Sequence, residues 1–214
     1  MNPRTILTLA NGRNIDLLNP TADDYRDLNW AAEHLAKENR YNGATPGVCY
    51  SVAQHTCECV VTAYAQTGDE ILAAYLSLHD VHEAVLKDDT TPKKRTFAAL
   101  AEAKFGVLAS QVMDAFDDLT NRHDAAIHEA AGLAWPPSPE MKRAIKHYDR
   151  IMLVTEWRDL MGGVPLPNAE AYADVAPLQR KIVPHAKWQS SAALLCLAWN
   201  KYLPARQVTA GASA

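Results

Sequence analysis

An apolar run that ends in a cluster of ionisable side chains sets the strongest limit on how this chain folds. Residues 71–78 are almost wholly apolar, and His79, Asp80, His82 and Glu83 follow within five positions. Leu72, Leu76, His79, Glu83 and Leu86 recur at helical spacing and therefore share one stripe of a helix. A helix that buries these leucines carries His79 and Glu83 toward the core, where an ionisable group without a partner is costly.

A bound metal ion is one way to compensate such buried groups. His79 and Asp80 are adjacent and about 100° apart on a helix, so they can supply two neighbouring ligands to one ion. Glu83 lies one turn further along the same side, near such an ion without being an obvious ligand. The same spacing also fits the C-terminal half of a helix with a solvated charged face, so this segment alone leaves both interpretations open.

Composition limits the class of protein. The chain has 214 residues, 48% hydrophobic and 21% charged, which suits one globular domain with a well-filled core. The net charge of −4 gives no basic excess, so nucleic acid is not expected as the main partner. No apolar stretch approaches the length of a membrane-spanning helix, and the N-terminus lacks a signal-peptide cleavage pattern. We expect a single domain over 1–203 and a disordered tail over 204–214.

The cysteines indicate a reducing compartment. Cys57 and Cys59 are two positions apart, which is wrong for a Cys-x-x-Cys site, and Cys49 and Cys196 stand alone. We interpret all four as reduced thiols in or near the core of a cytoplasmic protein.

The periodicity along the chain is helical after a short N-terminal hairpin. Asn11-Gly12 between two short apolar runs predicts a hairpin over 6–17. Residues 87–95 read as a polar loop with a cationic end, Lys93-Lys94-Arg95. The pattern therefore predicts an all-α fold of about six to eight helices. Helices are expected over 21–39, 50–64, 69–86, 96–105, 109–131, 140–161 and 187–202.

Two further ionisable residues fall among apolar neighbours on separate predicted helices, His55 and Asp149. With His79-Asp80 they give the order His, His-Asp, Asp. This order resembles the HD-domain metal-dependent phosphohydrolases. The similarity spans roughly 11–161 and is greatest to a small branch that includes bacterial 5′-deoxynucleotidases and phage triphosphohydrolases of deoxynucleoside triphosphates such as dATP. The matching segments are Asn39-Arg40-Tyr41, 50–55, 78–84, Asp88, Thr91-Pro92, 145–149 and 156–160.

The resemblance implies an HD-domain helical bundle around one divalent cation held by His55, His79, Asp80 and Asp149. Two imidazoles and two carboxylates suit Mn, Co, Zn or Fe better than Ca, which prefers oxygen ligands. Four protein ligands leave an octahedral ion two positions, one for water and one for a phosphate oxygen. The ion lowers the pKa of the water and withdraws charge from phosphorus.

The resemblance also implies roles around the ion. Glu83 acts beside the water as a general acid or base. Arg40 grips phosphate, Asp88 lies near the sugar and Tyr41 lies near the nucleoside. Lys94 follows the Thr-Pro turn and contacts phosphate. His82 receives no role.

The chain departs from the family pattern beside this site. Lys87 stands where a small residue is usual, and Asp89-Thr90 replaces an apolar-Pro pair. Both changes border the expected pocket, so they bear on the choice of substrate. The stretch from Gly163 onward matches no motif.

Two other classes of protein remain to be weighed. The run His79-x-x-His82-Glu83 could suggest a zinc peptidase, but the separate His55 and the distant Asp149 fit that class poorly. A non-catalytic nucleotide-binding scaffold could keep the helical fold, but the intact ligand set and Glu83 argue against it.

The expected function is phosphate release from a deoxynucleotide. The cationic cluster 93–95 could hold β- and γ-phosphates, which gives a slight preference for a triphosphohydrolase that releases triphosphate from a dNTP. The alternative is a 5′-deoxynucleotidase that removes phosphate from a dNMP. A small-molecule nucleotide is the expected partner, and a homo-oligomer is compatible with the sequence.

Overall fold

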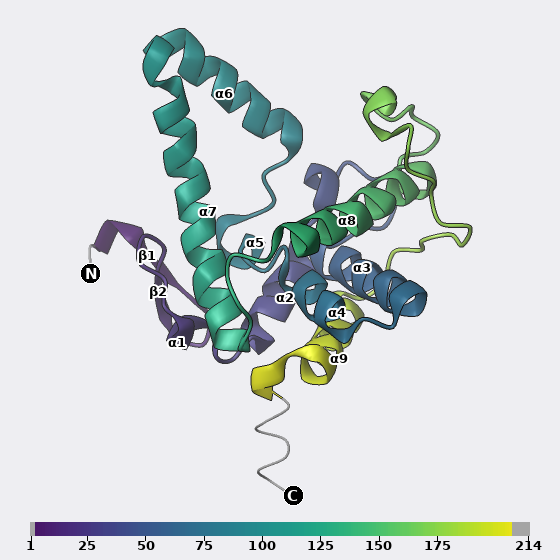
Figure 1. Ribbon diagram of the computed structural model, residues 1–214, viewed down its shortest axis with the longest axis horizontal. Helices are drawn as coiled ribbons and strands as arrows, with labels where there is room; N and C mark the ends of the chain where they lie inside the picture. Colours follow the sequence, from purple (N-terminus) through teal and green to yellow (C-terminus); the bar gives the residue numbers. More distant parts are fainter. Residues whose placement is uncertain (1–2, 207–214) are drawn as a thin grey trace, which may run out of the picture.

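Figure 1 shows the computed structural model of the chain, which describes residues 3–206. Helices dominate, and one two-stranded antiparallel sheet lies near the N-terminus, which confirms the predicted all-α class with a short hairpin. β1 (Ile6–Thr8) pairs with β2 (Asn14–Asp16), with Leu7 opposite Ile15. Gly12 has a φ of 80°, a conformation that favours glycine, so the turn lies where Asn11-Gly12 predicted it.

Most of the chain between the hairpin and residue 202 is helical. The described residues form α1 (Ala22–Tyr25), α2 (Asn29–Lys37), α3 (Val52–Thr67), α4 (Glu70–Leu78), α5 (Glu83–Leu86), α6 (Thr91–Phe105), α7 (Ala109–Ala131), α8 (Pro139–Leu160) and α9 (Trp188–Tyr202), with short 3₁₀ turns η1 (Pro3–Thr5), η2 (Arg40–Gly43), η3 (Gly106–Leu108) and η4 (Ala169–Tyr172).

The core lies where α3 is surrounded by other helices. α3 packs against α2, α4, α8 and α9, and α9 also packs against α2 and α4. Trp199 of α9 is fully buried and donates a hydrogen bond from its indole N–H to the carbonyl of Ser77 in α4 at 2.8 Å. The buried cluster runs from Leu9 to Leu203, so hairpin and last helix share one core.

Helix starts follow the capping residues that the sequence offers. The Ser51 hydroxyl accepts from the amide of Gln54 at the start of α3, and the Asp69 carboxylate accepts from two amides at the start of α4. Ser138 does the same for α8, with Pro139 in its first turn. These three starts agree with the prediction. The predicted helix 21–39 is instead two helices, α1 and α2.

The cluster segment is not one continuous α-helix, as the prediction had it. α4 ends at Leu78, and the next amides bond three residues back: Val81 to Leu78, Glu83 to Asp80 and Ala84 to Val81. Such 3₁₀-type bonding gives about three residues per turn, so side chains three apart eclipse each other. Asp80 and Glu83 therefore lie one above the other.

α6 and α7 form an arm that projects from the body of the molecule (Figure 1). α6 packs mainly on α7, and Ala101 is its only buried residue. α6 begins at Thr91, so the predicted polar loop 87–95 is wrong in its second half. Pro92 in the first turn favours that earlier start, and it places Lys93 and Lys94 on the helix.

Residues 161–187 connect α8 to α9, and side chains of α3 and α8 form hydrogen bonds with the backbone of this stretch. The Gln54 amide donates to the carbonyl of Val183 and accepts from the amide of His185, each at 2.8 Å. Asp159 accepts from the amide of Ile182 at 2.8 Å. Within the segment predicted as a tail, 204–206 form a helical turn, and 207–214 lie outside the described residues. Across residues 3–206, no helix combines the length and apolarity needed to cross a membrane.

Candidate metal centre

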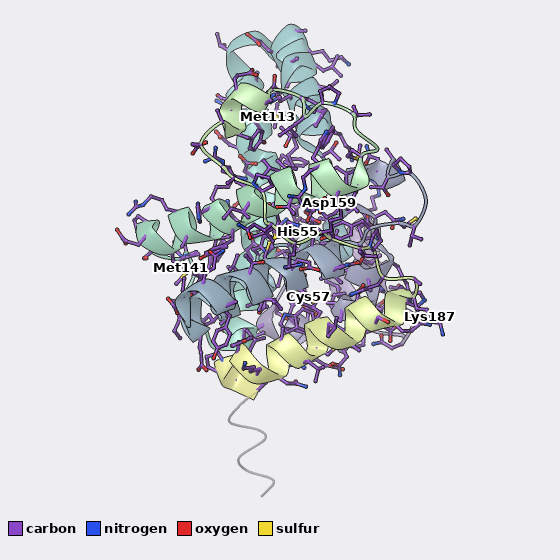
Figure 2. The ribbon with its side chains drawn as sticks, turned by 90° about the vertical axis from the view of Figure 1, so that its right-hand side faces the viewer. His55, Cys57, Met113, Met141, Asp159 and Lys187 are labelled. Carbon is purple, nitrogen blue, oxygen red and sulfur yellow. The ribbon has the colours of Figure 1, made fainter. Side chains whose placement is uncertain are left out.

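The predicted ligands come from three helices that pack together in the core. His55 lies in the second turn of α3, His79 and Asp80 follow the last residue of α4, and Asp149 lies midway along α8. Figure 2 shows His55 in the interior of the body beside α8. His55 is fully buried, while Asp80 and Asp149 keep partial access to solvent. Residues far apart in sequence thus meet at one point.

The donor atoms of these residues converge closely. Nε2 of His55 lies 3.3 Å from Nε2 of His79, and Nε2 of His79 lies 3.1 Å from Oδ2 of Asp80. Nε2 of His55 also lies 3.7 Å from Asp80 Oδ2 and 3.6 Å from Asp149 Oδ1. An ion with ligands at about 2.1 Å places neighbouring donors about 3.0 Å apart at right angles and about 3.4 Å apart in a tetrahedron. The distances of 3.1 and 3.3 Å match the edges of such a coordination shell, and those of 3.6 and 3.7 Å are slightly longer than a tetrahedral edge.

Glu156 fixes which nitrogen of His55 points into this space. Its Oε1 lies 2.5 Å from Nδ1 of His55. Burial raises the pKa of Glu156, but Arg40 and His55 outweigh burial and lower it to about 2. An ionised carboxylate can only accept, so His55 carries its proton on Nδ1. The lone pair of Nε2 then faces His79, Asp80 and Asp149, as in histidines that bind metals.

His79 is oriented in the same way by the backbone. Its Nδ1 donates to the carbonyl of Leu76 at 2.7 Å, which turns Nε2 toward His55 and Asp80. Burial lowers the pKa of His79, but the carboxylate of Asp80 outweighs it and raises the pKa to about 9. The pKa of Asp80 is lowered well below its usual range, because His79 and Arg40 outweigh its burial.

Two imidazole lone pairs and two carboxylates therefore face one small space. This arrangement is repulsive unless a positive charge lies between the groups, and a proton on His79 supplies one when no metal is bound. A divalent cation would satisfy all four donors at once, and mixed nitrogen and oxygen ligands suit Mn, Co, Zn or Fe. The donor set, its orientation and its spacing all fit such an ion.

Cys59 also lies beside this centre. Its sulfur is 3.6 Å from Nε2 of His55, and His55, Cys59 and His79 form a group whose donor atoms lie within 4.8 Å of one another. Burial, together with Asp149 and Glu156, raises the pKa of the Cys59 thiol well above its usual range. A metal ligand is the thiolate, and a bound cation lowers the pKa of a coordinating thiol, so Cys59 is a further donor within reach of the same space.

Asp149 is shared between the centre and Lys146. Its Oδ2 accepts from Nζ of Lys146 at 2.7 Å, while Oδ1 faces His55. Burial raises the pKa of Asp149, and His55 and Lys146 reverse this and lower it. Pairing with Lys146 therefore leaves one carboxylate oxygen directed at the centre.

Glu83 is a buried carboxyl next to the centre. Oε2 of Glu83 is enclosed and has no hydrogen-bond partner within residues 3–206. Burial and the charges of Asp80 and Asp88 raise the pKa of Glu83 well above its usual range. A carboxyl that is protonated more readily than usual, one turn from Asp80, is equipped to give or take a proton near a reacting group.

Two of the predicted substrate residues, Arg40 and Tyr41, lie against Glu156. Arg40 donates from Nε to Glu156 at 3.0 Å, and its NH1 lies 3.8 Å from Asp80. The Tyr41 hydroxyl donates to Glu156 at 2.6 Å, and its ring packs edge-on against Trp157. Both side chains therefore support the carboxylates of the centre.

Asp88 and Lys94 lie on the Glu83 side. Asp88 is half-buried, and burial raises its pKa, with Arg40 acting in the opposite direction. Lys87, just before it, has a φ of 76° and pairs with Glu38 at 2.8 Å, so a lysine occupies a backbone position that favours glycine. Lys94 is exposed and lines a small pocket beside Glu83.

Two pockets flank the centre. One has a volume of about 80 Å³ and its lining includes His82, Glu83, Lys87 and Lys94. The other, of about 220 Å³, has His79 and Asp149 in its wall. Neither Arg40 nor Tyr41 lines either of these pockets.

Glu156 received no role in the sequence analysis although it lies in a matching segment. It accepts from Arg40, Tyr41, Tyr50 and His55, and so joins the loop after α2 to α3 and α8. The sequence did hold one signal. Glu156 lies seven residues after Asp149, two turns along the same face of a helix, among apolar neighbours.

The fold and the site together define an all-α protein with a buried centre of two histidines and two aspartates. No family model matches the chain. Among curated proteins, the uncharacterized protein RCAP_rcc00048 of Rhodobacter capsulatus is 35% identical over 159 residues, which cover 72% of each chain. The chain belongs to the same family as this Rhodobacter protein. The name of that relative states no activity, so only the site bears on function.

Proposed function

We propose that this protein is a metal-dependent phosphohydrolase of the HD type that acts on deoxynucleotides. The observation that carries the proposal is the convergence of His55, His79, Asp80 and Asp149 on one space, with Glu83 beside it. These four residues would hold one divalent cation, Mn, Co, Zn or Fe. When bound, the cation lowers the pKa of water and withdraws charge from phosphorus.

The chain's own residues supply the remaining chemistry. Burial and the charges of Asp80 and Asp88 raise the pKa of Glu83, which suits its carboxylate to take a proton from water, or its carboxylic acid to give one to the leaving oxygen. Glu156 keeps the lone pair of His55 directed at the centre. Arg40 offsets negative charge on Glu156 and Asp80, and an incoming phosphate would meet the same guanidinium.

A triphosphate is slightly favoured as the substrate. Lys94 is exposed in the small pocket beside Glu83, where it could hold phosphates beyond the reacting one. Lys93 is less available, because it pairs with Asp89. Removal of phosphate from a dNMP is the alternative. We also propose a cytoplasmic setting, since all four cysteines are free thiols and Cys57 and Cys59 are buried.

The test is hydrolysis by protein purified without chelator. The protein is incubated with each common nucleotide and Mn, Co, Zn or Fe, and the inorganic product is identified. Intact triphosphate from a dNTP supports the triphosphohydrolase, and orthophosphate from monophosphates alone supports the nucleotidase. No release from any nucleotide contradicts the proposal, and the absence of stoichiometric metal would favour a scaffold without catalysis.

A further inference from the structure

The larger pocket opens directly from the candidate metal centre. His79 and Asp149 form part of its wall, and its volume is about 220 Å³. It lies where the end of α4, the last turns of α7 and the first half of α8 come together. A substrate whose phosphate reacts at the centre could extend into this space. The lining consists of Tyr75, His79, Asp124, His128, Trp135, Pro137, Lys142, Ile145, Lys146 and Asp149.

The walls of this pocket suit a flat ring. Three rings form a row: the centroids of Tyr75 and His128 are 5.5 Å apart, and those of His128 and Trp135 are 4.5 Å apart. Ile145 and Pro137 add apolar surface. Aromatic and apolar walls bind a nucleobase by stacking, whereas they offer phosphate nothing. Lys142 and Lys146 are exposed, and Lys146 already pairs with Asp149.

The buried polar atoms of the pocket are acceptors. His128 is 2% exposed, and its Nδ1 donates to the carbonyl of Asp124 at 2.7 Å, which leaves Nε2 with a lone pair. Burial lowers the pKa of His128, which keeps the ring neutral. Asp124 is 8% exposed, and its Oδ1 accepts from Nδ1 of His82 at 2.9 Å. The Tyr75 hydroxyl gives its proton to the carbonyl of Ala134.

Two of these acceptors are still available. Within residues 3–206, neither Oδ2 of Asp124 nor Nε2 of His128 has a hydrogen-bond partner, and neither is sealed from open space. Both acceptors face the space of the pocket, so a ligand that brings a hydrogen-bond donor can pair with them in place of water. Adenine and cytosine carry an exocyclic amino group where thymine and uracil carry a carbonyl oxygen, and guanine carries its amino group at C2. An amino group offers two N–H donors to two acceptors, whereas thymine and uracil offer only N3–H.

We infer that this pocket binds the base of the substrate and that Asp124 and His128 select bases with an exocyclic amino group over thymine and uracil. The inference rests on the proposed function, because it takes the substrate to be a nucleotide. The base then lies in the larger pocket, between α7 and α8, and the phosphates lie in the small pocket with Glu83 and Lys94.

Binding of deoxynucleosides to the full-length, metal-free protein tests the inference without hydrolysis. Calorimetry with deoxyadenosine, deoxycytidine, deoxyguanosine and thymidine should give about 10- to 100-fold weaker binding for thymidine. Equal affinity for all four, or no binding of any of them, overturns the inference.

Asp124→Asn supplies a donor in place of an acceptor and should move the preference toward thymidine. Asp117→Asn is the matched control, the same change at an exposed position of α7, and should leave the preference unchanged. An unaltered preference in folded Asp124→Asn contradicts the inference. If that variant does not fold, Trp135→Leu replaces it, and it should weaken binding of every base by about 10-fold.

The two proposals can fail separately. Selective nucleoside binding without phosphate release from any nucleotide would reject the hydrolase and keep the pocket assignment. Equal phosphate release from all dNTPs, unchanged in relative rate by Asp124→Asn, would keep the hydrolase and reject the assignment.

Discussion

His55 and Glu156 meet in the core at 2.5 Å, although 101 positions separate them in the sequence. Glu156 also accepts from Arg40, Tyr41 and Tyr50, and it is fully buried. One carboxylate thus fixes the proton on His55 and holds the loop after α2 against α8. The orientation of His55 in the candidate metal centre therefore depends on this contact.

Glu156→Gln should therefore weaken metal binding. A glutamine has one acceptor oxygen in place of two and no charge, so it holds the proton of His55 on Nδ1 less strongly, and loss of such an outer partner typically costs about 10- to 100-fold in metal affinity. Calorimetry with Co or Mn on chelator-stripped protein measures it. Glu140→Gln, at an exposed position of the same helix, is the control. Equal affinities in the two variants would remove Glu156 from this role.

Glu156 should also set part of the acid sensitivity of the metal-free fold. Its pKa is lowered from 4.5 to about 2 because Arg40 and His55 outweigh its burial. A folded pKa below the unfolded one stabilises the fold above about pH 4.5, and this stabilisation is lost as the pH falls toward 2. The contribution is about 3 kcal/mol. Urea unfolding at pH 5 and pH 2 should show a smaller pH-dependent loss in Glu156→Gln than in the unmodified chain.

Asp80→Ala should lose bound metal and activity together, because it removes both a charge and a ligand. Metal content after purification without chelator and phosphate release are measured on the same sample. A variant that keeps stoichiometric metal would show that Asp80 is not a ligand.

Glu83→Gln should separate chemistry from metal binding. Glu83 is one turn from Asp80, and the converging donor atoms belong to other residues. We expect normal metal content and a fall in kcat of about 10²- to 10⁴-fold, the usual loss for a general acid or base. Turnover at the original rate in metal-loaded protein would exclude Glu83 from the mechanism.

The core assignment can be tested with one substitution made at two places on α9. Leu195 is 0% exposed and Leu197 is 63% exposed. Leu195→Ala should lower the free energy of unfolding by about 2–5 kcal/mol, and Leu197→Ala by less than about 0.5 kcal/mol. Denaturant unfolding measures both. Similar losses in the two variants would mean that α9 is not seated as described.

The local features of this chain were predictable because short-range physics decides them. Asn11-Gly12 marked the hairpin, Ser51, Asp69 and Ser138 marked helix starts, and the apolar periodicity gave the all-α class. Burial of His55 followed from its apolar neighbours. The prediction failed at the start of α6. The polar residues 87–95 favoured a loop, whereas Pro92 favoured a first helical turn, and the helix begins at Thr91.

Pairings across helices were decided by the tertiary structure. Nothing near Arg40 or Tyr41 in the sequence indicates that both bind Glu156 instead of facing a pocket. The tightened turn after Leu78, which stacks Glu83 over Asp80, likewise depends on what the surrounding helices leave room for. The sequence by itself determined which side chains could not be buried alone. Only packing could determine their partners, because desolvation is a property of each residue, whereas an ion pair or hydrogen bond needs two atoms brought together by the fold.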